Sequence, residues 1–461
     1  MTRASQSWLI RHATLVNEGQ RFCSDLRIED GLIAQIALCI EPHAGDQVID
    51  ATGLWLLPGM IDDQVHFREP GLTQKADIAS ESRACAAGGI TSFMEMPNTR
   101  PPALDRDSLE AKYAIAAKSS VVNYAFYMGA SNDNLEAIRA IDPKSTPGVK
   151  VFMGASTGNM LVDDPAVLNG IFRDSPVTII THCEDSPMIE ANLQKALRSY
   201  GESIPAHLHP LIRSREACIK STRLAITLAR KHNARLHVLH ISTAEELELF
   251  EPGPLTNKRI TAETCVHFLH FNDSDYQQLG MKLKCNPAVK TERDRLAIVR
   301  ALAEGRIDVL ATDHAPHLLG EKDAAYQKAP SGVPLVQFAL QVALERVFAG
   351  ELTLERVVEA VSHAPAKLFE VSGRGFLREG YAADLVLVDP RRQHRVQQAE
   401  VLSKCGWSPF EGSTFSSSIV STFVNGQRVW DGTAVMSGLH GHRLSFDRQL
   451  SSLSAFARKP S

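Results

Sequence analysis

Between residue 58 and about residue 365, short apolar runs alternate with longer segments in which apolar positions recur every three or four residues. The longer segments include residues 107–117, 214–231 and 333–348, and their spacing is typical of helices that bury one face. The apolar runs are the expected strands, and they end near the following residues: His66, Met96, Met128, Met153, His182, His240, Cys265 and Asp313. Strand and helix units in this alternation predict an α/β fold, a (β/α)8 TIM-like barrel.

Both ends of the chain follow a different, β-rich pattern. Residues 1–57 alternate apolar and polar side chains around the hairpin turn signal Asp30-Gly31. Strand-like runs return at residues 383–388 and 418–424. We therefore expect one small β-sandwich domain built from both chain ends, residues 1–57 and 366–461, beside a barrel of residues 58–365.

The composition narrows the class of protein. Of 461 residues, 44% are hydrophobic and 22% are charged, which is ordinary for a globular chain. A net charge of −4 without a long basic run argues against a nucleic-acid partner, and no apolar run reaches the ~20 residues that span a membrane. The 8 cysteines are scattered singly, which favours reduced thiols over a disulfide framework. We expect a cytoplasmic protein with a small-molecule substrate.

Candidate metal ligands occur where the expected strands end. In a parallel barrel these ends meet around one cavity. The candidates are Gln64 and His66 on the first strand, Lys150 on the fourth, His182 on the fifth, His240 on the sixth and Asp313 on the eighth. A single histidine at a strand end is more often a hydrogen-bonded structural residue, but several such groups together favour a metal site. Histidine and carboxylate ligands suit zinc, which polarises carbonyls and makes hydroxide available at neutral pH.

Strand alternation separates candidate ligands from their neighbours, because residues two apart share a face of a strand. Gln64 and His66 therefore point to the same side. If His240 points into the barrel, His237 is three residues earlier and is expected to face the outer helices as a structural residue. The same argument places Cys183 outside the barrel.

Residues 58–71 resemble the signature of the dihydroorotases, which are cyclic amidohydrolases of the amidohydrolase superfamily. Further matching motifs follow in order at residues 96–99, 148–153, 181–184, 240–243, 286–287 and 312–317. The resemblance covers nearly the whole chain. Each motif alone is weak, but together they are highly specific.

The resemblance implies reversible hydrolysis of L-dihydroorotate to N-carbamoyl-L-aspartate in pyrimidine (UMP) biosynthesis. It implies one or two zinc ions per chain, with Lys150 N6-carboxylated so that it can bridge two metals, and it assigns ligand roles to His66, Lys150, His182, His240 and Asp313. It also implies that Asp313 carries the proton from water to the leaving nitrogen. The implied substrate contacts are Arg68, Asn98, Asn286, His317, Ser331 and Gly332. Members of the family commonly form homodimers or larger homo-oligomers.

Gln64 departs from the family pattern, which has a histidine there as a second ligand on the first strand. Three alternatives stay open: loose coordination by Gln64, a single metal ion, or an inactive relative that serves as a scaffold. The scaffold would resemble the catalytically silent dihydroorotase-like subunit that binds aspartate transcarbamoylase. Because the other ligands, the substrate residues and Asp313 are all present, we favour an active enzyme.

Hydantoinase and allantoinase are the enzymatic alternatives, since they share the barrel and the metals but open rings without the same carboxylate. Arg68 and Asn98 favour dihydroorotate, because an arginine fork accepts a carboxylate through two hydrogen bonds. Residues 156–160, after the fourth expected strand, are either a lid over the site or an ordinary βα loop.

Overall fold

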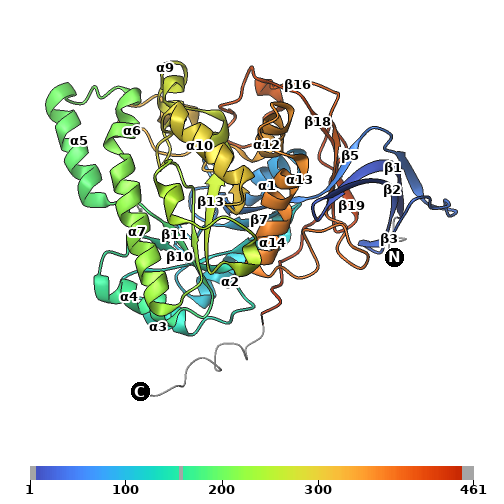
Figure 1. The fold of residues 1–461 in the computed structure, drawn as a ribbon, viewed down its shortest axis with the longest axis horizontal. Coiled ribbons are helices and arrows are strands. Elements are labelled where there is room, and N and C mark those ends of the chain that lie inside the picture. Colours follow the sequence, from blue (N-terminus) through green and yellow to red (C-terminus); the bar gives the residue numbers. More distant parts are fainter. Residues whose placement is uncertain (1–6, 155–158, 449–461) are drawn as a thin grey trace.

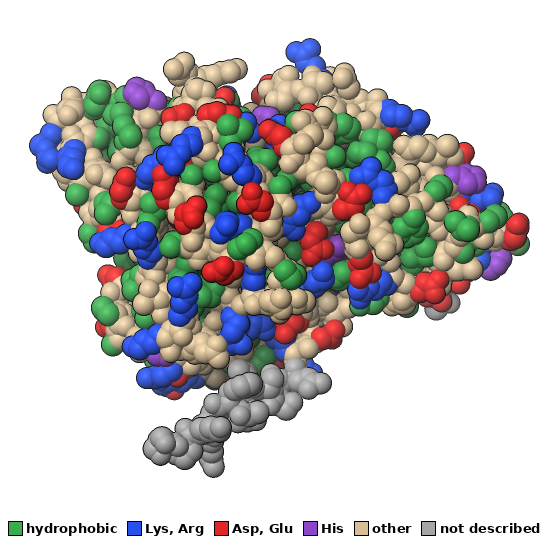
Figure 2. Space-filling view, viewed as in Figure 1, with side chains coloured by type: hydrophobic (Ala, Val, Ile, Leu, Met, Phe, Trp, Pro, Cys, Tyr) green, Lys and Arg blue, Asp and Glu red, His purple; other side chains and the backbone are tan. Residues whose placement is uncertain are grey.

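The computed structural model of the protein describes residues 7–154 and 159–448. A barrel surrounded by helices occupies one side, and the strands of both chain ends lie together on the other side (Figure 1). This arrangement confirms the α/β fold class expected from the sequence. On the face seen in Figure 2, basic and acidic side chains are interspersed over the helices.

Parallel strands form the barrel wall and end within two residues of the positions expected from the sequence. The strands are β6 (Met60–Val65), β7 (Ile90–Glu95), β8 (Asn123–Phe126) continued by β9 (Met128–Gly129), β10 (Gly148–Phe152), β11 (Thr178–His182), β12 (Leu236–Val238), β13 (Ile260–Cys265) and β14 (Val309–Ala311). A parallel bridge between Val65 and His314 joins the last strand to the first and closes the ring. Their carboxyl ends therefore surround one opening.

The helices lie outside the strands, and most follow the strand that precedes them in the chain (Figure 1). They are α1 (Ile78–Ala87), α2 (Arg106–Ser119), α3 (Leu135–Arg139), α4 (Pro165–Asp174), α5 (Ser186–Tyr200), α6 (His209–Ile212), α7 (Arg215–His232), α8 (Val266–His270), α9 (Tyr276–Leu279), α10 (Glu292–Ala303), α11 (Leu319–Lys322), α12 (Ala339–Phe348), α13 (Leu354–Val358) and α14 (Ala364–Phe369). Among the described residues, none of these helices is long and apolar enough to cross a membrane.

The expected helix over residues 333–348 starts late, at Ala339. The backbone N–H groups of Leu335 and Val336 instead lie 2.8 and 3.3 Å from Nδ1 of the His314 ring. This contact holds the start of the segment against the end of β14. A side chain more than twenty residues away therefore decides where this helix begins, and the apolar spacing alone does not show it.

Strands from both chain ends form one sheet in the order β19-β18-β15-β5-β1-β2-β3, with β4 also paired to β1. Their bounds are β1 (Trp8–Asn17), β2 (Gln20–Glu29), β3 (Leu32–Ala37), β4 (Gln47–Asp50), β5 (Trp55–Pro58), β15 (Leu385–Asp389), β18 (Ser418–Val424) and β19 (Gln427–Trp430). Two short strands, β16 (His394–Arg395) and β17 (Thr414–Phe415), pair separately. The sheet folds over on itself, because the rings of Trp8 in β1 and Phe423 in β18 lie only 5.3 Å apart although two strands separate them.

The end of the described chain returns to the barrel after leaving the sheet. The backbone N–H of Leu444 donates to the carbonyl of Tyr124, and the buried Arg448 guanidinium donates to four backbone carbonyls. Phe446 lies in the apolar cluster that fills the barrel interior. The division at residues 57/58 and 365/366 stays a prediction.

A buried ion pair fixes the chain at the end of the first barrel strand. The Lys112 ammonium of α2 lies 2.8 Å from Oε2 of Glu95, and both side chains are almost fully buried. The other oxygen of Glu95 accepts the backbone N–H of Phe67 at 2.9 Å. Because Phe67 lies between His66 and Arg68, this pair positions two of the candidate site residues.

We expect Lys112→Met to lower the free energy of unfolding by about 3–5 kcal/mol, because it leaves the Glu95 carboxylate buried without its cation. Urea denaturation followed by circular dichroism measures the change. Lys118→Met is the matched control, since Lys118 lies on the same helix and is exposed. Equal stability of the two variants would contradict this role for Lys112.

Candidate active site

A cavity of about 590 Å³ opens at the carboxyl ends of the barrel strands. It is lined by every site residue that the sequence predicted: Gln64, His66, Arg68, Asn98, Lys150, His182, His240, Asn286, Asp313, His317, Ser331 and Gly332. Leu72, Phe152 and Met160 add apolar surface. Residues 155–158, which hold most of the expected lid segment, lie outside the described residues.

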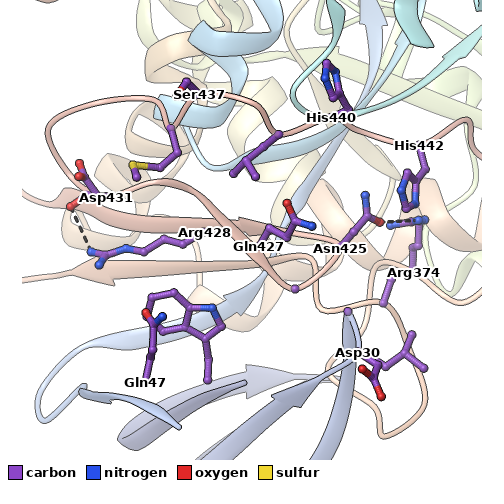
Figure 3. Close-up of a pocket in the computed structure, with 17 residues that line it drawn as sticks. Asp30, Gln47, Arg374, Asn425, Gln427, Arg428, Asp431, Ser437, His440 and His442 are labelled. Atoms are coloured by element: carbon purple, nitrogen blue, oxygen red, sulfur yellow. Dashed lines mark hydrogen bonds between the residues drawn. The ribbon is translucent and has the colours of Figure 1, made fainter. Parts of the chain in front are cut away.

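A larger hollow of about 1000 Å³ lies between the folded sheet and the segment that follows it (Figure 3). Its two arginines already have partners inside the protein. Arg374 is paired with Asp384, and Arg428 donates to the carbonyl of Asp431. Its described lining residues include no convergent set of histidines and carboxylates. The barrel cavity is therefore the candidate active site.

The first pair of candidate ligands joins β6 to the end of β14. Nε2 of His66 lies 3.2 Å from Oδ1 of Asp313. Burial alone would raise the pKa of Asp313, but the hydrogen bond and the charge of His66 outweigh burial and hold that pKa at about 2. Asp313 is therefore an ionised carboxylate at neutral pH, able to hold a cation or to accept a proton.

Gln64 turns its amide group toward the same carboxylate. Its Nε2 donates to Oδ1 of Asp313 at 3.1 Å, and its Oε1 lies 3.7 Å from the Cys265 thiol. In this orientation the amide presents N–H, not oxygen, to Asp313. Gln64 and His66 do share a side of the strand, as alternation predicts.

The second pair is His182 and His240, whose Nδ1 and Nε2 atoms lie 2.9 Å apart. Nε2 of His182 faces Oε2 of Glu184 at 2.9 Å, and Glu184 also pairs with Arg213. Burial alone would raise the pKa of Glu184, but Arg213 and His182 hold it well below its usual range. A carboxylate behind a histidine fixes which ring nitrogen faces a metal.

Lys150 lies between the two pairs. Burial lowers the pKa of its ammonium to about 8, and the charge of Asp313 only partly opposes this effect. Burial is the main cause of the lowered pKa of His66, His182 and His240, and the charge of Lys150 adds to it. Among residues 7–154 and 159–448 the ammonium has no hydrogen-bond or ion-pair partner, only the Phe152 ring 4.7 Å away.

The expectation for His237 is wrong. His237 is fully buried and lies against Phe369, which belongs to the apolar cluster that fills the barrel interior. Leu239 belongs to the same inner cluster, so the inward positions of this strand are 237 and 239. His240 follows the end of β12 with φ of 42°, and this left-handed residue turns its ring toward the cavity. Strand alternation therefore ends before His240.

Cys183 is buried beside His182, and its thiol contacts the hydroxyl of Thr181. Its raised pKa, about 11, has burial as its main cause, with smaller opposing effects of hydroxyls on α7. Cys183 therefore faces α7, outside the barrel, as expected. All eight cysteines are unpaired.

Cationic groups gather at the end of the cavity near His317. Nη2 of Arg68 and Nζ of Lys75 each lie 3.0 Å from a ring nitrogen of His317. Burial, followed by the charges of Arg68 and Lys75, lowers the pKa of His317 far below its usual range, so this ring is neutral. Glu321 balances Lys75 at 2.9 Å. Arg68 has no carboxylate partner among the described residues and is left to hold an anion.

Asn98, in the segment after β7, and Asn286, in the segment before α10, both line the cavity. Oδ1 of Asn98 lies 2.8 Å from Nδ1 of His66, so Asn98 orients a candidate ligand as well as lining the substrate space. Oδ1 of Asn286 is buried without a hydrogen-bond partner among the described residues. A buried carbonyl oxygen without a donor is a place for a ligand N–H.

Two buried lysines, Lys284 and Lys322, hold the loop that carries Ser331 and Gly332. The Lys322 ammonium donates to the carbonyls of Lys284, Pro330 and Gly332, and burial lowers its pKa to about 7. Gly332 has φ of 144°, and a Cβ there would lie 2.4 Å from the carbonyl oxygen of Ala315. Only glycine fits this position.

Sequence reasoning missed several residues that support the site. Glu81 holds His314 at 2.7 Å, Asp62 accepts the hydroxyl of Thr312 at 2.6 Å, and Glu184 holds His182. Their signal was partly present, because Asp62, Glu184, Thr312 and His314 all lie within the motifs that resemble the family. Glu81 lies outside these motifs, so nothing in the sequence marks it as part of the site.

The residues present fit a divalent metal ion. Three histidines each direct one ring nitrogen toward a neighbouring ligand. Asn98 holds the other ring nitrogen of His66, and Glu184 holds the other ring nitrogen of His182. Asp313 supplies a carboxylate, and Lys150 is a buried amine without a hydrogen-bond partner among the described residues. Nitrogen and oxygen donors of this kind suit zinc. Gln64 is the exception among the predicted ligands, because its amide oxygen, the atom that could bind a metal, faces the Cys265 thiol.

Comparison with known proteins gives consistent results. Residues 55–429 match the family model described as the amidohydrolase family. A protein named dihydroorotase from Halobacterium salinarum is 34% identical over 435 residues, covering 93% of this chain and 97% of the relative. A protein named allantoinase from Rubrobacter xylanophilus is 30% identical over 443 residues, covering 94% and 96%. The solved L-hydantoinase (dihydropyrimidinase) from Arthrobacter aurescens has a TM-score of 0.90 at 27% identity, covering 95% of this chain and 99% of that one.

Proposed function

The chain belongs to the amidohydrolase family, and we propose that within it the protein is a dihydroorotase that hydrolyses L-dihydroorotate reversibly to N-carbamoyl-L-aspartate. The relatives named dihydroorotase support this choice, whereas the allantoinase and hydantoinase neighbours support the coarser class of cyclic amidohydrolase. The proposal places the protein in pyrimidine biosynthesis. Its cytoplasmic location and assembly as a homodimer or larger homo-oligomer stay predictions.

The observation that carries the proposal is the cationic end of the cavity. Arg68 is 8% exposed, lacks a carboxylate partner among the described residues and faces the same cavity as Asp313. Burial lowers the pKa of its guanidinium to about 10, so it stays charged at neutral pH. A buried, unpaired guanidinium calls for an anion. Dihydroorotate offers a carboxylate beside its reacting amide, and hydantoin and allantoin do not.

The chain's own residues would then bind and orient the ring. Arg68 holds the substrate carboxylate, with the neutral His317 ring beside it as a hydrogen-bonding neighbour. Oδ1 of Asn286 and the backbone at Ser331 and Gly332 face the remaining polar edge of the ring. Lys322 keeps that backbone in place.

Asp313 performs the proton transfer in this proposal. Its ionised carboxylate accepts the proton of the water whose oxygen bonds to the ring carbonyl carbon. It then delivers this proton to the ring nitrogen as the carbon–nitrogen bond breaks. His66 holds Oδ1 of Asp313 during the transfer. In the reverse direction the same groups close the ring and release water.

His66, Lys150, His182, His240 and Asp313 would hold zinc. Bound there, zinc would polarise the ring carbonyl and make hydroxide available from water at neutral pH. The lowered pKa of Lys150 supports N6-carboxylation, because the neutral amine is the form that reacts with carbon dioxide. Carboxylated Lys150 would be an anionic ligand in the same cavity, able to help hold one or two metal ions.

The identity of residue 64 gives a direct test of the metal arrangement. We expect Gln64→His to raise the zinc that survives dialysis against a chelator, because imidazole is a stronger ligand than an amide whose N–H faces Asp313. Elemental analysis per chain measures the difference from wild type. The exposed Gln277→His is the matched control. Unchanged zinc in the Gln64 variant would show that position 64 does not border the metal.

A catalytically silent scaffold that binds aspartate transcarbamoylase is the second candidate, and the orientation of Gln64 is the observation in its favour. Ring opening of L-dihydroorotate by the purified protein distinguishes the two. We expect turnover with at least one zinc per chain in the cavity. No turnover together with far less than one zinc per chain in the cavity would favour the scaffold.

A further inference from the structure

A second group of potential metal ligands lies inside the barrel, and none of its members lines the cavity. Asp63 of β6, His237 of β12 and Glu263 of β13 are each fully buried. Nε2 of His237 lies 3.3 Å from Oδ2 of Asp63 and 3.5 Å from Oε2 of Glu263. The three ligand atoms all lie within 4.8 Å of one another. Within the described part of the chain, no other three histidine, cysteine or carboxylate side chains bring their ligand atoms this close together.

The surroundings of this triad are apolar. The ring of Phe369 lies 5.9 Å from His237, and Tyr127 lies against Phe369. Between residues 7 and 448, outside the gap at 155–158, neither Asp63 nor Glu263 has a lysine or arginine partner. Two carboxylates thus share one imidazole in a water-poor interior. Burial, followed by the charge of Asp63, raises the pKa of Glu263.

The tautomer of His237 follows from its other ring nitrogen. Nδ1 lies 2.7 Å from Oγ1 of Thr261, and the Thr261 hydroxyl donates its hydrogen to the carbonyl of Leu236. Thr261 must therefore accept, so Nδ1 carries a hydrogen. In the neutral ring Nε2 then carries a lone pair, which points at two carboxylate oxygens.

With that neutral ring, three lone-pair-bearing atoms converge without a donor between them. Without an ion, burial alone would lower the pKa of His237, but Asp63 and Glu263 outweigh burial and raise it to about 9. Both oxygens of Asp63, Oε2 of Glu263 and Nε2 of His237 lack a hydrogen-bond partner among the described residues. A proton on Nε2 does not supply the missing hydrogen bonds, because an N–H group there points at neither carboxylate with hydrogen-bond geometry. A cation centred among the three atoms would satisfy all of them at once.

We propose that Asp63, His237 and Glu263 bind a divalent transition-metal ion, zinc in the first instance, at a structural site inside the barrel that is separate from the cavity. Ligands at about 2.1 Å and tetrahedral angles lie about 3.4 Å apart, which matches the two separations from His237. Donation from Nδ1 to Thr261 is the outer hydrogen bond that metal-bound histidines usually make.

This ion would position a residue of the cavity. The second oxygen of Glu263, Oε1, accepts the backbone N–H of His240 at 3.2 Å. His240 has the left-handed φ of 42° that turns its ring toward His182. Fixing Oε2 of Glu263 on an ion would therefore hold the carboxylate that keeps His240 in this conformation. The Cys265 thiol lies 3.6 Å from Oε1 of Glu263 and separates the two sites.

Zinc content in a chain that lacks one histidine of each cavity ligand pair tests the proposal. In the background His66→Ala/His182→Ala, we expect about one zinc per chain after dialysis against a chelator, because a fully buried ion exchanges only when the fold opens. Adding Asp63→Asn or Glu263→Gln should remove at least about nine-tenths of this zinc. Adding Glu246→Gln, an equally buried carboxylate bound to Thr222 and Thr243, should leave it in place.

Anomalous scattering at the zinc edge from crystals of the wild-type protein gives a readout that does not depend on variants that fold. We expect a peak among Asp63, His237 and Glu263, distinct from any peak in the cavity. No peak there in zinc-loaded crystals, or equal zinc in the Asp63→Asn and Glu246→Gln backgrounds, would overturn the proposal and leave an imidazolium between two carboxylates. Neither measurement depends on turnover, so failure of the proposed activity is distinguished from failure of this site.

Discussion

Replacing Asp313 by asparagine should lower the turnover of L-dihydroorotate by on the order of a thousandfold, with kcat falling more than KM rises. Asparagine keeps the shape of the side chain but does not accept a proton. The carboxylate of Asp313 is ionised at neutral pH and is held by His66 and Gln64, and the proposed mechanism uses it to carry the proton from water to the leaving nitrogen. Initial rates at saturating substrate measure the effect.

The zinc content of the Asp313→Asn protein is determined on the same sample, so that loss of metal is separated from loss of proton transfer. Asp323→Asn is the matched control, because Asp323 is exposed and ten residues away from Asp313. Undiminished turnover by Asp313→Asn would remove the proposed proton carrier. Loss of the cavity zinc would instead assign Asp313 mainly a ligand role.

Arg68→Met should raise KM for L-dihydroorotate by about 100-fold and change the rate on hydantoin little, because a charge-assisted bond to the carboxylate is worth about 1.5–3 kcal/mol. Arg68→Lys should recover only part of the loss, since lysine keeps the charge but lacks the fork that binds both carboxylate oxygens. The comparison of both substrates on each variant separates carboxylate recognition from general damage to the cavity.

Arg83→Met serves as the control for the Arg68 variants, because Arg83 is exposed on α1. An equal loss of activity on dihydroorotate and hydantoin in Arg68→Met would show that Arg68 supports the fold or the metal site instead of binding the substrate carboxylate. Its contacts with Pro316 and His317 make this a real alternative outcome.

The candidate site could be predicted from the sequence because its residues lie where strands end. Topology brings such residues together whatever their distance along the chain, as with His66 and Asp313. Strand alternation was enough to predict that the side chains of Gln64 and His66, at the end of one strand, point to the same side. It failed for His237, because φ of 42° at His240 breaks the alternation after β12. A single dihedral angle of this kind leaves no trace in a hydrophobic pattern.

The supporting contacts could not be predicted for a different reason. Lys322 reaches the carbonyls of Lys284, Pro330 and Gly332, and Arg448 reaches those of residues 143–147. Backbone carbonyls look alike in every sequence, so nothing marks which of them a buried cation will meet. The orientation of the Gln64 amide depends likewise on Asp313 and Cys265, which lie far away in the chain.

The most direct test of the account compares the ring opening of L-dihydroorotate, hydantoin and allantoin by one wild-type sample whose zinc content is known. We predict that kcat/KM for L-dihydroorotate exceeds both other values by at least about 100-fold, because only dihydroorotate places a carboxylate on the buried Arg68 guanidinium. An equal or higher kcat/KM for hydantoin or allantoin would contradict it.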